Sequence, residues 1–139
     1  MKIPVCAGGF LIKKSKFLFG KRSAKKTWAP KMWDIVGGHS LKGEHPLDTL
    51  KRETFEEIGV TVLNARLMTS VDVLDEKEDE YFRYHIYMIT SWKGKPANLS
   101  DEHTKIRWFT RKKIGKIKIA SKEYLTLLDD WLHGQKIVE

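Results

Sequence analysis

The sequence predicts a mixed α/β or α+β sandwich, in which strands alternate along the chain with two or three helices. Short segments rich in β-branched and aromatic residues recur between Gly, Pro, Asn and charged residues, which is typical of strands and their turns. Two longer segments instead show the apolar spacing of an amphipathic helix. Because the chain has 139 residues, 41% of them apolar and 32% charged, we expect residues 1–139 to form a single globular domain.

The N-terminal part is expected to consist mainly of β-strands. Residues 23–32 are polar and basic and are expected to form a loop. At Gly37 and Gly38 we expect a break in the sheet, because glycine allows unusual backbone angles. Strands are predicted at residues 5–12, 16–21 and 33–36, the first two being joined by the basic turn KKSK.

The first helix is predicted at residues 46–58. Pro46 suits its first turn, where a backbone N–H is not needed, and Gly59 is typical of the position just after a helix. An apolar stripe runs along this helix and can pack against the sheet. The stripe is formed by Leu47, Leu50, Thr54 and Ile58.

The second half of the chain is expected to begin with two long strands. A strand is predicted at about residues 60–70, and the acidic residues 72–80 are expected to form a solvated hairpin or loop. β-Branched and aromatic residues predict the second strand at 81–92. Gly, Pro and Asn predict a loop at 93–102, before a short strand at 106–109.

Two helices are expected near the C-terminus. Thr110 is suited to cap a short basic helix, and Ser121 to cap a last helix that ends before Gly134. The last helix has an apolar face formed by Tyr124, Leu125, Leu128, Trp131 and Leu132.

The chain is strongly basic, since 26 Lys and Arg against 18 Asp and Glu give a net charge of +8. This excess favours anionic partners such as nucleic acid, phosphorylated metabolites or anionic membranes. The single cysteine, Cys6, excludes an internal disulfide and indicates a reducing, cytoplasmic compartment. The N-terminal apolar run is short and interrupted by Pro and Gly, so we expect neither a leader nor a membrane association.

Three glutamates gather on one side of the first predicted helix. Glu53, Glu56 and Glu57 lie three and four residues apart, so their carboxylates share one face, about 110° from the apolar stripe. Like charges at this spacing repel and oppose helix stability. One interpretation is a solvated acidic face. The other is a site for Mg²⁺ or Mn²⁺, which prefer carboxylate oxygens and also engage substrate phosphates.

The stretch from Gly38 to Val60, GHSLKGEHPLDTLKRETFEEIGV, resembles the Nudix box. That pattern is Gly, five residues, Glu, seven residues, Arg-Glu, an apolar residue, any residue, Glu-Glu, any residue, Gly and an apolar residue. Thr54 occupies the first apolar position and is the one departure from the pattern. Every fixed identity is matched, by Gly38, Glu44, Arg52, Glu53, Glu56, Glu57 and Gly59.

The resemblance implies the Nudix fold, an α/β/α sandwich around a mixed β-sheet. It also implies hydrolysis of a nucleoside diphosphate linked to another moiety, by attack of water on phosphorus. A MutT-like reaction is favoured, in which a nucleoside triphosphate yields a monophosphate and pyrophosphate. Alternatives are a Nudix enzyme acting on ADP-ribose, dinucleoside polyphosphates or the 5′ triphosphate end of RNA, and a non-catalytic module that binds nucleotides or RNA 5′ ends.

The resemblance also implies a divalent cation, Mg²⁺ or Mn²⁺, that bridges phosphate oxygens. Glu56 and Glu57 are expected as direct ligands, and Glu53 as a ligand or as the base that deprotonates water. The carbonyl of Gly37 could be another ligand. Arg52 is expected to serve catalysis by orienting Glu53 or Glu56 through charge-assisted hydrogen bonds.

The remaining box residues are expected to shape the site. Gly38 and Gly59 have geometric roles in this interpretation, and Glu44 either reaches the cation through water or braces the loop. Family members commonly supply a further Glu several residues ahead of a Trp, and Glu102 lies six positions before Trp108. We expect Glu102 to be a metal ligand or the general base, and we leave open whether Glu53 or Glu102 is that base.

Two neighbours of Glu102 are polar as well. Asp101 would take the role of Glu102 if that assignment is wrong, and His103 is expected to be a bystander. A polar turn without any role in the site is the ordinary alternative for both acids, since acidic residues are common in loops.

Outside the box, four residues are predicted to bind substrate. Arg22, with the lysines around it, could contact phosphates, and Trp33 could stack on a base. His39 flanks the loop within the box, and His85 could hydrogen-bond a ligand. Each also has an ordinary interpretation as surface charge, core aromatic or surface histidine. Further aromatics could stack on a base, namely Trp28, Phe82, Tyr84 and Tyr87.

Two macromolecular partners are also considered. The basic residues 111–118 could touch RNA, although a solvated helix is favoured there. A homodimer is considered because many family members pair.

Overall fold

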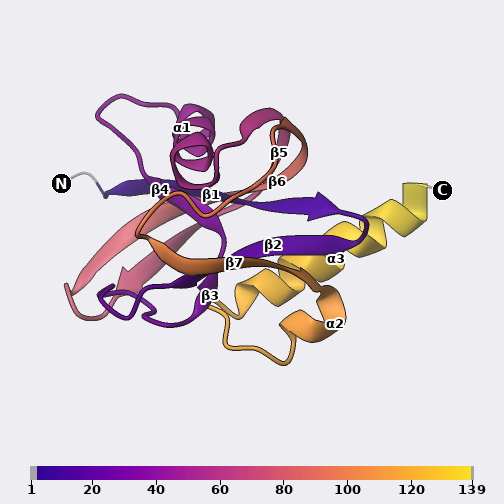
Figure 1. The fold of residues 1–139 in the computed structure, drawn as a ribbon. Helices are drawn as coiled ribbons and strands as arrows, with labels where there is room; N and C mark the ends of the chain where they lie inside the picture. Colours follow the sequence, from indigo (N-terminus) through magenta and orange to yellow (C-terminus); the bar gives the residue numbers. More distant parts are fainter. Residues whose placement is uncertain (1–2, 139) are drawn as a thin grey trace.

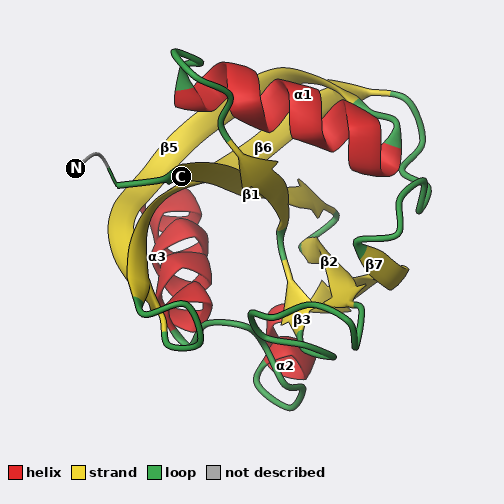
Figure 2. Cartoon of the chain, turned by 90° about the vertical axis from the view of Figure 1, so that its left-hand side faces the viewer, coloured by secondary structure: helices red, strands yellow, loops and turns green. Residues whose placement is uncertain are grey.

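The computed structural model describes residues 3–138, and the side chains of residues 3–134. The strands are β1 (Val5–Lys13), β2 (Lys16–Arg22), β3 (Trp33–Asp34), β4 (Val36–His39), β5 (Thr61–Asp75), β6 (Glu80–Lys93) and β7 (His103–Thr110). The helices are α1 (Pro46–Ile58), α2 (Arg111–Ile114) and α3 (Glu123–Val138). Figures 1 and 2 show α1 and α3 on opposite faces of the sheet. This arrangement confirms the predicted α/β class.

Strand β1 is the centre of the sheet, because it pairs with three others. It runs parallel to β6 and antiparallel to β4 along its first half. Its end turns back through a tight hairpin into β2, which pairs antiparallel with β3 and β7. The sheet is therefore mixed, with the main order β3-β2-β1-β6-β5.

The side chains of β1 alternate between two cores, as the period of a strand requires. Cys6 and Phe10 face α3 and pack with the apolar residues of that helix. Ala7 and Leu11 face α1, where they pack with Leu50. A strand covered on both faces is expected to be almost continuously apolar, which explains the run from Val5 to Ile12.

The predicted break at Gly37 and Gly38 is wrong, because both glycines lie inside β4 and pair with Gly8 and Ala7 of β1. The two strands approach so closely that a Cβ on Gly37 would lie 2.3 Å from the carbonyl oxygen of Ala7. Glycine is needed here for close packing of two backbones rather than for an unusual backbone angle.

Strand β5 is longer than predicted. The acidic segment from residue 72, expected to form a solvated hairpin or loop, belongs to a hairpin in which the strand continues to Asp75 and the turn occupies only residues 76–79. Asp72 lies opposite Arg83 of β6, and their side chains pair with an N–O distance of 2.9 Å. A cross-strand ion pair thus allows a polar segment to remain in the sheet.

Helix α1 has the predicted bounds. His45 caps its start, with Nδ1 accepting from the N–H of Leu47 at 3.1 Å, and Pro46 follows in the first turn. Gly59 ends the helix in the left-handed conformation, with a φ of 72°. In contrast, α3 continues through Gly134, where we predicted its end, since one glycine within a helix costs only about 1 kcal/mol.

Among the described residues, no helix combines the length and apolar character needed to cross a membrane.

Candidate active site

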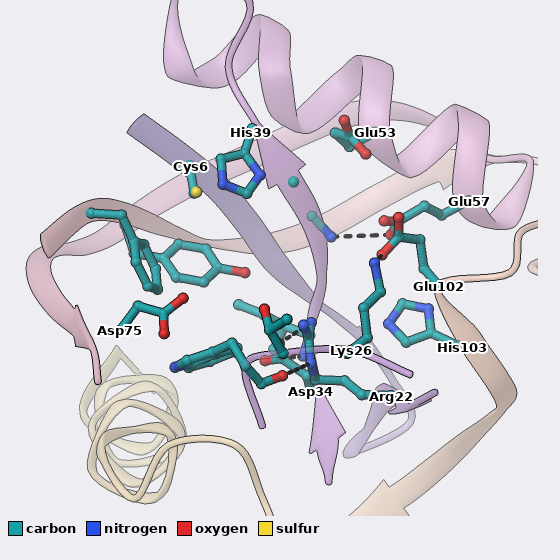
Figure 3. Close-up of a pocket in the computed structure, with 17 residues that line it drawn as sticks. Cys6, Arg22, Lys26, Asp34, His39, Glu53, Glu57, Asp75, Glu102 and His103 are labelled. Atoms are coloured by element: carbon teal, nitrogen blue, oxygen red, sulfur yellow. Dashed lines mark hydrogen bonds and ion pairs between the residues drawn. The ribbon is translucent and has the colours of Figure 1, made fainter. Parts of the chain in front are cut away.

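A cavity of about 330 Å³ opens beside α1, β4 and the start of β7 (Figure 3). Its lining combines two kinds of side chain. Carboxylates come from α1, from the turn before β7, from β3 (Asp34) and from the end of β5 (Asp75), and aromatic rings come from the β2–β3 loop and β6. The residues that line the cavity include Arg22, Lys26, Trp28, Asp34, Gly37, Gly38, His39, Glu53, Glu57, Phe82, Tyr84, Glu102 and His103.

Glu57 is the most deeply placed carboxylate of α1. Only 3% of the residue is exposed, which does not fit the solvated acidic face considered as the ordinary interpretation of the three glutamates. It lies next to Ile58 at the edge of the packed stripe, and its Oε2 accepts from the N–H of Gly37 at 3.2 Å. Burial raises the pKa of Glu57 to about 9, and the charge of Glu53 adds to this rise. The carboxyl group is therefore poised to gain strongly from a nearby cation.

Glu53 lies directly against Gly38 of β4. A Cβ on Gly38 would stand 2.5 Å from the carboxyl carbon of Glu53, so only glycine leaves room for this side chain. Burial raises the pKa of Glu53, and the ion pair with Arg52 opposes the rise. The close approach of β4 to α1 thus fixes where the Glu53 carboxylate lies.

Arg52 connects the glutamates of α1 to the loop at residues 40–45, which joins β4 to α1. Its guanidinium holds both oxygens of Glu44 at 3.0 Å, donates to Glu53 at 2.8 Å and donates to the carbonyl of His39 at 2.9 Å. The hydrogen bonds that Arg52 donates to Glu44, with further ones from the N–H of Leu41 and the hydroxyl of Thr49, lower the pKa of Glu44 to about 2. Glu44 therefore acts through Arg52 and the loop, in line with the bracing role considered for it.

Glu56 does not belong to the cavity lining. Its side chain is 57% exposed, and its nearest charged partner is Arg52, at 3.4 Å. The three glutamates of the predicted face are therefore divided. Glu53 and Glu57 line the cavity, while Glu56 stands at its outer edge.

Glu102 brings a carboxylate to the cavity from a distant part of the chain. It lies just before β7, and its negative charge contributes to the raised pKa of both Glu53 and Glu57. Figure 3 shows Glu102 and Glu57 pointing toward the same space, with Lys26 reaching Glu102 from below. Asp101, its neighbour, is exposed and does not line the cavity.

The other end of the cavity holds aromatic rings and the carboxylate of Asp75. Trp28 packs edge-on against Phe82 with ring centres 5.8 Å apart, and Phe82 packs against Tyr84. Arg22 lies over Trp28, with its guanidinium carbon 5.0 Å from the ring centre.

Arg22 is held between the loop and a buried carboxylate. It donates to the carbonyl of Trp28 at 2.7 Å and to Asp34 at 3.4 Å. Burial raises the pKa of Asp34, while the hydroxyl of Tyr124 and the charge of Arg22 lower it. A guanidinium is thereby fixed between the carboxylate and aromatic ends of the cavity.

The predicted substrate-binding residues fall into two groups. Arg22 and His39 line the cavity. Trp33 instead packs edge-on against Phe109 at 4.8 Å on the α3 side, and His85 pairs with the hydroxyl of Ser70 at 2.7 Å. Neither of these two lines the cavity, so their geometry gives no support to a role in substrate binding.

Lys26 and His103 also line the cavity. Lys26 is one of the lysines around Arg22 that were considered for phosphate contact, with solvated surface charge as the favoured interpretation, and His103 was expected to be a bystander. His103 is only 5% exposed and fits over Gly20, where a Cβ would lie 2.5 Å from its ring. Burial lowers the pKa of His103 to about 4, and its Nδ1 has no hydrogen-bond partner among the described residues.

Of the further aromatics considered for base stacking, Trp28, Phe82 and Tyr84 line the cavity and Tyr87 does not. Trp28 stands in a polar, basic loop, where packing does not call for an indole. Such an aromatic is a better candidate for a ligand contact than Trp33, which follows the strand pattern.

The oxygen donors around the carboxylate end fit a hard divalent cation. The carboxylates of Glu53, Glu57 and Glu102 and the backbone of Gly37 meet at one end of the cavity. Across the described part of the chain, no group of three or more His, Cys, Asp or Glu side chains already has metal-binding geometry. A bound cation would therefore have to draw these carboxylates closer together.

The family model described as NUDIX domain matches residues 2–130 of the chain. Among curated proteins, the 8-oxo-dGTP diphosphatase of Buchnera aphidicola (subspecies Schizaphis graminum) is 33% identical over 87 residues, which are 63% of this chain. The match spans 63% of that relative, less than two thirds of its length.

Solved structures share the fold. A MutT Nudix hydrolase from Burkholderia pseudomallei superposes with a TM-score of 0.74 at 25% identity, covering 81% of this chain and 86% of that one. A MutT protein from Methanosarcina mazei superposes with a TM-score of 0.80 at 19% identity, covering 98% and 99% of the two chains.

Proposed function

Because the chain belongs to the Nudix family, we propose that it hydrolyses a nucleoside triphosphate to a nucleoside monophosphate and pyrophosphate, as a MutT-like pyrophosphohydrolase. The observation that carries this proposal is the division of the cavity into two ends. Three glutamates suited to a cation occupy one end, and aromatic rings occupy the other beside a single carboxylate, that of Asp75, while Arg22 lies over the ring of Trp28. A nucleotide has the same division, with phosphates at one end and a flat base at the other. A cavity of about 330 Å³ is within the range of small-molecule sites.

Nudix hydrolases generally depend on a divalent metal ion, and we propose Mg²⁺ or Mn²⁺ for this chain. Its ligands in this proposal are Glu53, Glu56, Glu57 and Glu102 with the carbonyl of Gly37. A bound ion of this kind supplies positive charge beside the phosphate oxygens and lowers the pKa of bound water. Glu56 would have to turn inward, which its exposure permits.

In this proposal the other site residues bind the substrate, orient Glu53 and accept a proton. Arg22 binds phosphate with a guanidinium already held in place by Trp28 and Asp34. Arg52 orients Glu53 through the hydrogen bond at 2.8 Å. Glu53 or Glu102 accepts the proton of the attacking water. The aromatic end holds the base, and His39 contacts the substrate from the rim.

The curated relatives direct the choice of substrate. The relatives matched at 28% to 35% identity are all named 8-oxo-dGTP diphosphatases, so purine deoxynucleoside triphosphates, with the oxidised guanine form first, are the substrates to test. ADP-ribose, dinucleoside polyphosphates and RNA 5′ triphosphate ends belong in the same panel. Homodimer formation and RNA binding stay predictions.

The test is product release from this panel with Mg²⁺, with Mn²⁺ and with EDTA, with chromatographic separation of pyrophosphate from phosphate. We expect metal-dependent formation of monophosphate and pyrophosphate from at least one triphosphate. Turnover of ADP-ribose alone would contradict the MutT-like reaction. Binding of nucleotides without turnover of any of them would instead support the non-catalytic module.

A further inference from the structure

Lys26 is the one lysine, among the residues that the structure describes, whose ammonium pairs with a carboxylate. It reaches the carboxylate of Glu102 from the β2–β3 loop, and both side chains line the cavity (Figure 3). The pair is accessible to water, since the two side chains are 30% and 45% exposed. Two other lysines of the same loop, Lys25 and Lys31, are exposed and do not line the cavity.

The position of the loop does not depend on this ion pair. The N–H of Ser23 donates to the carbonyl of Glu102 at 3.2 Å, and the N–H of Lys26 donates to the carbonyl of Ser23 at 3.1 Å. Backbone hydrogen bonds thus tie the loop to the turn before β7. The Lys26 side chain is free to change partner while its backbone stays in place.

The charge of Lys26 matters because three carboxylates face the same space. Glu53, Glu57 and Glu102 line one end of the cavity. Burial is the main cause of the raised pKa of Glu53 and of Glu57, and the negative charge of Glu102 adds to both rises. An ammonium on Glu102 offsets part of this negative charge in the cation-free protein. A divalent cation on the same carboxylates supplies more positive charge and competes directly with it.

We propose that Lys26 is an exchangeable counter-ion. Its ammonium pairs with Glu102 while no divalent cation is bound, and it pairs with a phosphate of the substrate once a cation binds Glu102. The first part, competition between Lys26 and the cation for Glu102, rests on the geometry of the ion pair. The second part, pairing of Lys26 with phosphate, rests on the proposed function. As a consequence, Lys26 weakens cation binding in the free protein and couples it positively to nucleotide binding.

The first experiment uses Mn²⁺ alone, with free Mn²⁺ measured by electron paramagnetic resonance. Lys26→Met is expected to bind Mn²⁺ about threefold to fivefold more tightly than the wild type, the range for release of a partly exposed ion pair. Lys25→Met, the matched control, removes the same charge from the same loop and is expected to change the affinity by less than about twofold. Equal affinity in the wild type and Lys26→Met, or equal gains in both variants, would overturn the exchange.

A double-mutant cycle with Glu102→Gln separates direct competition from a general effect of charge. In the Glu102→Gln background the ammonium has lost its partner, so Lys26→Met is expected to change Mn²⁺ affinity less than in the wild type. An undiminished gain would mean that Lys26 acts elsewhere. Thermal melts of all variants check that the fold is retained.

The proposed pairing of Lys26 with a substrate phosphate is tested with Mn²⁺ and a non-hydrolysable triphosphate analogue. Lys26→Met is expected to bind the analogue about threefold or more weakly, opposite in sign to its effect on Mn²⁺. A purely structural loss would weaken both ligands together and would overturn the proposal. If the wild type binds no analogue and turns over no substrate, the proposed function fails, while the Mn²⁺ titration still decides the exchange.

Discussion

At the scale of single residues, Glu57 combines deep burial with a carboxylate group. We expect Glu57→Gln to keep the fold with an unchanged or slightly raised melting temperature, because a neutral amide suits the buried position and can still accept from Gly37. Turnover should fall by orders of magnitude if the carboxylate binds the cation. The measurement is kcat beside a thermal melt, and wild-type turnover at low Mg²⁺ would contradict the assignment.

The turn before β7 offers a matched pair of acids. Glu102 lines the cavity and Asp101 does not, so Glu102→Gln should lose at least tenfold in kcat, about 1.4 kcal/mol of barrier, while Asp101→Asn stays near normal. Steady-state kinetics on the confirmed substrate decide between them. The reverse order would transfer the role to Asp101, and two near-normal variants would confine the chemistry to α1.

The lowered pKa of Glu44 leads us to expect that stability depends on pH. Its pKa is lowered from 4.5 to about 2 by Arg52, so its stabilising effect is complete above pH 4.5 and is lost as the pH falls toward 2. Glu44→Gln should therefore be less stable than the wild type at about pH 6, and the difference should shrink on acidification. Urea unfolding at several pH values measures this.

An exposed acid serves as the control for this experiment. Glu76 lies in the turn between β5 and β6, away from Arg52. If Glu76→Gln showed the same pH-dependent difference as Glu44→Gln, the effect would not come from the Arg52 network.

At the scale of elements, strand β4 positions the glutamates of α1. Its two glycines have different nearest neighbours, since a Cβ on Gly37 would meet the backbone of β1 and a Cβ on Gly38 would first meet the Glu53 carboxylate. Gly37→Ala should lower the free energy of unfolding by about 2 kcal/mol or more, because backbone cannot move aside.

The Gly38→Ala variant separates an effect on the active site from an effect on stability. Gly38→Ala should cost much less stability, because a flexible side chain gives way, but kcat should fall at least tenfold, about 1.4 kcal/mol, as Glu53 is displaced. Chemical denaturation and kinetics on both variants test the contrast. Similar stability losses in the two would contradict the separate roles.

At the scale of the whole molecule, a cation joins parts of the chain that are far apart in sequence. Glu53 and Glu57 belong to α1, and Glu102 precedes β7. Millimolar Mn²⁺ or Mg²⁺ should therefore raise the melting temperature, by mass action on the folded state, and EDTA should reverse the rise. A concentration one hundred times Kd corresponds to about 2.7 kcal/mol. An unchanged melt would count against the site.

The sequence by itself determined the family, helix α1 and the order of the chemically active residues along it. These features are local, since Pro46, Gly59 and the glutamates between them lie within one continuous helix whose period is set by its backbone. The Nudix assignment needed only this spacing, and the match to the family confirms it. The extent of β5 and the pairing of Gly37 and Gly38 were predicted wrongly, because both depend on a neighbouring strand.

Only the tertiary structure decided which residues form the cavity. Glu57 is buried and Glu56 exposed, although they are adjacent in sequence, because β4 packs against one side of α1 and solvent covers the other. Likewise, Lys26 meets Glu102 because β2 pairs with β7, which brings together segments about 75 residues apart. Such contacts depend on how strands pair and helices pack, and no local pattern records them.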